Sequence, residues 1–181
     1  MLCRILTQSD YMVCRELYDK FTDADPLRPP IPTLNRYYFG DDEPLSMVIG
    51  AFDEYGVLSV CVFVIFSKHD RSISIRYVMK HPFADKSMVV GVLEFVANMS
   101  RNSNYCKMYI SYFNNRAAAW ERLLRNSEIF NRYTAVVEEV IPASRKSSFT
   151  RYWTEMQGCK ISLEPMTIKM YSLKQEFRPI L

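Results

Sequence analysis

The sequence lacks several features that would assign the protein to a class at once. It has no apolar run of about 18 residues, so we expect no membrane-spanning helix. No basic segment followed by a long apolar run stands at the N-terminus, so we expect no secretory signal peptide. The net charge is only +3, from 23 basic and 20 acidic residues, and by itself does not indicate a nucleic-acid partner.

Metal and disulfide sites also have few residues to draw on. No two of the five cysteines have C-x-x-C spacing, and only His69 and His81 could add imidazole ligands. We therefore expect no metal centre, and we expect reduced, mostly buried cysteines of a protein in a reducing cytoplasm. The cysteines are Cys3, Cys14, Cys61, Cys106 and Cys159.

The length and composition are those of one folded α/β domain. The chain has 181 residues, of which 49% are hydrophobic, and that is enough for a full core. No repeat, low-complexity tract or linker divides it. We expect residues 1–181 to form a single domain.

The first part of the chain predicts a strand, a helix and a loop. Residues 2–6 are a short apolar run, and in residues 11–21 the apolar side chains recur every three or four positions, as in an amphipathic helix. Residues 22–44 contain five prolines and an acidic cluster, so we expect a long loop with one short helix near residues 34–39.

The next segment predicts an antiparallel meander of three strands. Residues 45–52, 57–66 and 73–79 are rich in β-branched and aromatic side chains and are joined by short polar turns. Residues 57–66 are almost continuously apolar, which is typical of a central strand covered on both faces. In residues 73–79 the alternation has a period of two.

The second half predicts helix, strand, helix, strand, strand. Residues 88–99 have helical periodicity, and residues 107–113 form an apolar strand. Asn114 follows at once and is expected to cap an Ala-rich helix. Two more strands are expected over residues 133–141 and 167–173, with a possible helix over 149–157 between them.

This order resembles the GNAT acetyltransferase superfamily over nearly the whole chain. The segment from Arg4 to Tyr18 resembles the opening strand and first helix of the family, and the segment at Asn114 resembles its strand-to-helix junction. The resemblance implies a single mixed sheet in which the loop after the fourth strand, with the following helix, holds the pyrophosphate of acetyl-CoA.

The loop departs from the family pattern of Arg or Gln, two residues, Gly, one residue, then Gly or Ala. Ala84, Ser87 and Val89 stand at these three positions. The branched side chain of Val89 is expected to crowd a bound phosphate, and Asp85 is expected to cap the helix and repel an anion. If acetyl-CoA binds, the resemblance implies contacts from Lys86, Ser87, Met88, Val89 and Asn114.

The candidate catalytic groups are few. Residues 72–84 contain no carboxylate to serve as a base, and His81 is the one imidazole there, or else a turn residue before Pro82. Glu121 stands where the family has a tyrosine acid, and a carboxylate is a poor proton donor at neutral pH. Trp120 fits either a ligand pocket or the core, and Lys86 either a phosphate contact or a solvated surface.

Two features near the C-terminus suggest partners. Residues 142–181 hold seven basic residues against three acidic ones, interleaved with aromatic side chains, which fits nucleic acid, an acidic protein surface or an ordinary basic surface. The tail at 175–181 carries Phe177, Ile180 and Leu181, which could dock on a neighbour in an assembly or on its own domain.

Three functions remain open on these observations. The first is a non-catalytic GNAT-like domain without a cofactor, acting through protein–protein interaction, for example as a component of a phage virion assembled in the cytoplasm. The second is an acyl-CoA-dependent N-acetyltransferase with an unusual pyrophosphate loop. The third is a small host-takeover protein that binds a host target.

Overall fold

The computed structural model describes residues 1–21, 28–29, 31–39, 46–127, 130–131, 135–141 and 166–173. Its strands are β1 (Leu2–Ile5), β2 (Ser46–Phe52), β3 (Leu58–Ser67), β4 (Ser72–Lys80), β5 (Lys107–Phe113), β6 (Ala135–Ile141) and β7 (Met166–Ser172). Its helices are α1 (Tyr11–Lys20), α2 (Ile31–Thr33), α3 (Lys86–Asn102) and α4 (Ala117–Arg125), with short helical turns η1 (Gln8–Asp10), η2 (Leu34–Tyr38) and η3 (Asn114–Arg116).

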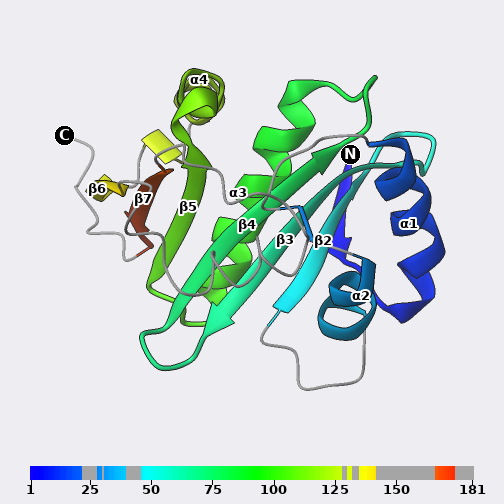
Figure 1. Ribbon diagram of the computed structural model, residues 1–181, viewed down its shortest axis with the longest axis horizontal. Helices are drawn as coiled ribbons and strands as arrows, with labels where there is room; N and C mark the ends of the chain where they lie inside the picture. The colour runs from blue at the N-terminus through cyan, green and yellow to red at the C-terminus, as the bar shows by residue number, and fades with distance from the viewer. Residues whose placement is uncertain are drawn as a thin grey trace.

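The strands form one mixed sheet in the order β1-β2-β3-β4-β5-β7-β6 (Figure 1). Neighbouring strands are antiparallel except β4 and β5, which are parallel. The predicted order of elements and the three-strand meander β2-β3-β4 are confirmed. The predicted helix over residues 149–157, most of the basic segment and the tail at 175–181 lie outside the described residues.

Strand β3 is covered on both faces, as its apolar run predicts. Val60, Val62 and Val64 belong to a core shared with α3, whereas Cys61 and Phe63 belong to a second core shared with α1 and η2. Alternate side chains of a strand point to opposite faces, so an apolar layer on each face requires a continuous apolar run. The helices therefore form a layer on each side of the sheet.

Helix α1 packs through one apolar stripe. Its buried residues, Cys14, Leu17 and Tyr18, are spaced by three and one, and they lie on a single face of the helix. The Cys14 and Cys61 sulfurs lie 3.9 Å apart, and both are free thiols, as expected for buried cysteines. None of the helices in the described ranges is long and apolar enough to cross a membrane.

Helix α3 covers the other face. Its buried residues recur every three or four positions, so each turn adds an apolar side chain to the core, with a stabilisation of about 1.5–3 kcal/mol for a fully buried Val or Leu. These residues are Val89, Val92, Leu93, Val96, Ala97 and Ser100.

Asn114 does not cap the helix that follows it, so this prediction was wrong. The chain first makes the 3-10 turn η3, and Arg116 stands at the N-cap position of α4 without a capping side-chain hydrogen bond. The Asn114 Oδ1 instead accepts a hydrogen bond of 2.6 Å from the Thr167 hydroxyl on β7. Asn114 therefore ties the end of β5 to its neighbour in the sheet.

Candidate functional site

The sheet opens between β4 and β5. Their pairing runs only from Ser72 opposite Lys107 to Ile75 opposite Ile110, although β4 continues to Lys80 and β5 to Phe113. Figure 1 shows the two strands close together at one end and apart at the other. The second half of β4 thus has β3 on one side and a gap on the other.

A β-bulge lies at the point where the gap begins. Phe63 of β3 is opposite Tyr77 and Val64 is opposite Ile75, so Arg76 is an extra residue in β4. A bulge bends its strand and increases the local twist. The bulge therefore accounts for the divergence of β4 from β5 directly after Ile75.

The bulge also changes which face each residue meets. Ile73 and Ile75 lie in the core under α3, but Tyr77 and Met79 lie in the core under α1 and η2, and Val78 packs on the α3 side. A regular strand would put all four odd-numbered residues on one face. The period-two pattern of residues 73–79 thus predicts the strand correctly but not the change of face.

Aromatic side chains border the gap on the α3 side. Tyr112, on β5 beyond the last β4–β5 pair, is buried, and its ring stacks on that of Trp120 of α4 with centroids 5.8 Å apart and planes 9° apart. Trp120 is partly buried against the α3-side core. The interpretation of Trp120 as a core residue is confirmed.

On the opposite side the bulge residue meets η2. The Arg76 guanidinium is near the buried Tyr38 hydroxyl. Burial lowers the pKa of Arg76 and raises the pKa of Tyr38, and the attraction between their charged forms opposes both shifts. The dominant cause is desolvation, and Arg76 as a whole residue is half-buried.

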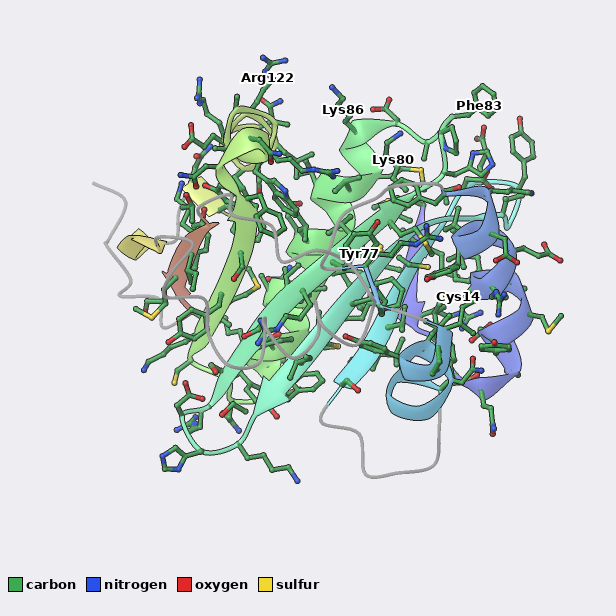
Figure 2. All side chains as sticks on the ribbon, in the orientation of Figure 1. Cys14, Tyr77, Lys80, Phe83, Lys86 and Arg122 are labelled. Atoms are coloured by element: carbon green, nitrogen blue, oxygen red, sulfur yellow. The ribbon has the colours of Figure 1, made fainter. Side chains whose placement is uncertain are left out.

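The loop from β4 to α3 is organised around Lys80. The Lys80 ammonium donates hydrogen bonds to the carbonyl oxygens of Ala84, His81 and Pro82, at 2.9, 3.1 and 3.4 Å. The Ala84 N–H donates to the His81 carbonyl oxygen, and the Phe83 N–H donates to His81 Nδ1 at 3.3 Å. Figure 2 shows Lys80 within the molecule and Phe83 pointing out of the loop.

In the first turn of α3, backbone N–H groups also have hydrogen-bond acceptors within the chain. The Ser87 N–H donates to the Asp85 carboxylate at 3.0 Å, and the Met88 N–H donates to the Asp85 carbonyl oxygen at 3.0 Å. Asp85 is the N-cap, as predicted. The Val89 side chain is only 6% exposed and lies in the core, and its effect on a bound phosphate stays a prediction. Lys86 is exposed and points outward (Figure 2).

Comparison with known proteins shows that solved structures share this architecture. The sequence matches no protein-family model and no curated protein. Solved structures match it at low identity. A probable acetyltransferase from Staphylococcus epidermidis has a TM-score of 0.69 at 12% identity, with 96% of this chain and 99% of that one covered.

Two further solved structures have the same architecture. The ribosomal-protein-S18-alanine N-acetyltransferase of Escherichia coli has a TM-score of 0.64 at 8% identity, over 99% of this chain and 98% of that one. A Desulfovibrio desulfuricans protein named as a GNAT-family acetyltransferase has a TM-score of 0.61 at 11% identity, over 96% and 99%. The fold is GNAT-like. At these identities the likeness establishes the fold alone.

Within the GNAT-like fold the predicted catalytic residues do not meet at one point. The His81 N–H donates to the Ser59 carbonyl oxygen and its Nδ1 accepts from Phe83, which are the contacts of a turn residue. Glu121 lies on the flank of α4 that faces β7. It lines a hollow of about 370 Å³ whose other lining residues are Leu124, Arg125, Phe130, Asn131, Lys169 and Tyr171. Their catalytic roles stay predictions.

The structure adds two residues at the gap that the sequence did not single out. Arg76 is a charge within the strand, and Tyr112 is one of several tyrosines near Asn114. The only sequence signal for Arg76 was its charge. Tyr112 shares a strand face with Met108 and Ile110, whereas Tyr109 lies on the opposite face, so the period of two could have separated them.

The loop after β4 differs from a phosphate-binding loop built of backbone amides. The loop does not offer a row of unengaged amides to a pyrophosphate, because the N–H groups of Phe83, Ala84, Ser87 and Met88 have acceptors within the chain. Exposed Lys86 supplies positive charge at the helix N-terminus. A phosphate at the start of α3 would therefore meet side-chain charge rather than unengaged amides.

Proposed function

We propose that the protein is an acyl-CoA-dependent N-acyltransferase whose phosphate-binding loop relies on the Lys86 side chain. The observation that carries the proposal is the gap between β4 and β5, which opens at the Arg76 bulge. Bulges are enriched beside active sites because they redirect side chains and end strand pairing. The GNAT-like fold and its acetyltransferase neighbours support the same reading.

The chain's own groups would divide the work as follows. An acyl-CoA, when bound, supplies an activated thioester. In residues 76–80 the N–H and C=O groups that do not pair with β3 point into the gap, where they can position an extended ligand. Tyr112, buried on β5 beyond the last β4–β5 pair, would be the proton donor, in place of Glu121 on α4. The Lys86 ammonium attracts phosphate at the start of α3.

A non-catalytic GNAT-like domain is the second candidate, and one specific observation favours it. The loop and the first turn of α3 satisfy four of their own N–H groups, and Asp85 places a negative charge where a phosphate would approach. Such a loop is complete without a cofactor. The two candidates therefore differ in whether any acyl-CoA binds.

Calorimetric titration with acetyl-CoA tests the proposal. We expect micromolar binding that weakens with salt, since the exposed Lys86 ammonium attracts the phosphates. Asp85→Asn should bind two- to fivefold more tightly, about 0.3–1 kcal/mol, because Asn keeps the cap but removes the like charge. Lys86→Gln should bind more weakly by a similar factor.

The two outcomes separate the candidates cleanly. An absence of heat at millimolar acetyl-CoA, in the natural protein and in Asp85→Asn alike, would leave only the non-catalytic domain. Lys68→Gln serves as the matched control, because it removes an exposed positive charge in the turn between β3 and β4, at the other end of β4 from Lys86.

A further inference from the structure

Two buried cysteines from different elements meet beneath α1. Cys14 lies on α1 and Cys61 on β3, and both are fully buried free thiols whose sulfurs are 3.9 Å apart. They are 47 positions apart in the chain, so only the packing of the helix on the sheet brings them together. The sulfurs of a disulfide are about 2 Å apart. The remaining distance is comparable with the movement of a sulfur between side-chain rotamers.

The other described cysteines are placed elsewhere. Cys3 packs against the core under α3, whereas Cys14 and Cys61 belong to the core under α1 and η2, on the opposite face of the sheet. The Cys106 sulfur lies 3.6 Å from the carbonyl oxygen of Arg71, at the far end of β4 from the loop. The contact between Cys14 and Cys61 therefore belongs to the α1 side of the sheet alone.

The packed helix protects the pair from oxidation. Burial raises the pKa of the Cys61 thiol, and the neighbouring Cys14 raises it further. The thiolate is the form that reacts with oxidants, so little of the reactive form exists while the thiol is buried. Because neither residue is exposed, an oxidant in solution also cannot reach the sulfurs. Oxidation therefore requires that α1 open first.

Helix α1 is suited to such local opening. It has ten residues, of which it buries only Cys14, Leu17 and Tyr18, and Met12 and Val13 are exposed. A helix of this length is marginally stable without tertiary contacts. Elements with few buried contacts open at a lower free energy than the central strands of a sheet. Opening of α1 would thus expose Cys14 while the sheet stays folded.

We propose that Cys14 and Cys61 are a redox modification site, at which a peroxide joins them in a disulfide that locks α1 onto β3. One thiolate attacks the O–O bond of hydrogen peroxide, which gives a sulfenic acid and, after protonation, one water. The second sulfur then attacks the sulfenic sulfur, the S–O bond breaks, and the oxygen leaves as a second water. The two thiols lose two electrons and two protons, and one peroxide is reduced to two waters.

The disulfide would act on the layer that covers the second half of β4. Tyr77 and Met79, which belong to that half, share a core with Cys14 and Cys61. A covalent link between distant positions restricts the opened chain far more than the packed one, so it favours the packed helix. The inference does not depend on the proposed acyltransfer function, because it concerns the helix and not the binding of acyl-CoA.

Peptide mapping of the natural protein tests whether the disulfide forms. The folded protein is treated with hydrogen peroxide, unfolded in urea with iodoacetamide and digested with trypsin without a reductant. Trypsin leaves Cys14 in the peptide 5–15 and Cys61 in the peptide 37–68. We expect these two peptides to be linked after peroxide and separate after dithiothreitol. Recovery of both as separate peptides after peroxide, alkylated or carrying oxygen, would overturn the inference.

Hydrogen exchange tests whether the disulfide locks the helix. In the oxidised protein, amide exchange across residues 11–20 should slow by at least about tenfold relative to the reduced protein. Cys14→Ala should show no slowing after peroxide, and Cys3→Ala is the matched control that should keep it. A linked protein whose α1 exchanges as fast as before would show that no lock forms. If Cys14→Ala does not fold, the oxidised and reduced natural proteins give the same decision.

Discussion

The second half of β4, which borders the gap to β5, and the loop that follows β4 are adjacent in the chain. They differ in whether their backbone polar groups have partners within the protein. In the gap, β4 leaves backbone groups of residues 76–80 without a neighbouring strand. In the loop, Lys80 and Asp85 satisfy the carbonyl and N–H groups of the turn and of the helix start. One region leaves its strand edge unpaired with the neighbouring strand, and the other bonds its own polar groups.

The difference has a physical origin. A bulge and a splayed strand pair are backbone features that many side chains can support, because they require only one inserted residue. A phosphate-binding loop needs unengaged N–H groups and small residues that let a ligand approach. The bulge and the separation of β4 from β5 therefore do not require a phosphate-binding loop, and they are compatible with a loop that contains Lys, Pro and Asp.

Deletion of Arg76 should have the largest effect on this comparison. Ile75 and Tyr77 would then pair with Val64 and Phe63 in a regular ladder, and each remaining residue would keep its face. We expect a folded protein with the gap closed and acetyl-CoA affinity reduced at least a hundredfold, about 2.8 kcal/mol. Calorimetry measures the affinity and circular dichroism checks the fold.

Arg76→Gln is the matched control, because it removes the charge but keeps the bulge. It should retain the affinity for acetyl-CoA within about threefold, roughly 0.6 kcal/mol. Undiminished binding after the deletion would show that the bulge does not create the ligand site.

Val89→Ala should act on stability and not on the loop. Val89 is 6% exposed in the α3-side core, so the loss of two methyl groups should lower the free energy of unfolding by about 1–2 kcal/mol. Urea denaturation measures this change. The affinity for acetyl-CoA should stay the same, and a marked gain would revive the idea that this side chain obstructs phosphate.

Lys80→Gln should have the smallest effect of the three. It removes the ammonium that holds three loop carbonyls, and we expect a loss of about 1 kcal/mol with faster hydrogen exchange at residues 83–88. Lys80→Arg is the control that keeps the charge. Unaltered exchange in Lys80→Gln would mean that Pro82 and Asp85 suffice to shape the loop.

Much of the fold was predictable because periodicity reflects burial. The apolar run of β3 predicted a strand with two covered faces, and the three- and four-residue spacing in α1 and α3 predicted their buried stripes. The capping role of Asp85 was also predictable, because a short acidic side chain before a helix has one dominant local partner. These features depend on neighbours within a few residues.

The candidate site was less predictable. Asn114 has the side chain of a helix cap, but its Oδ1 accepts a hydrogen bond from the hydroxyl of Thr167, which lies on β7 and is far away in the sequence. Val89 was placed against a phosphate because the loop was compared with a pattern, and its actual direction depends on how α3 rolls against the sheet. Neither the bond to Thr167 nor the direction of Val89 can be read from a local sequence pattern.

The sequence by itself determined the order of strands and helices, the two-sided burial of β3 and the altered chemistry of the loop after β4, since each follows from side chains close together in the chain. Only the tertiary structure decided where Arg76 lies. The inserted residue in β4 can be recognised only by comparison with the partner strand β3, because a bulge is a mismatch between two paired strands and not a property of either strand alone. That mismatch ends the pairing of β4 with β5 and places a half-buried cation at that point.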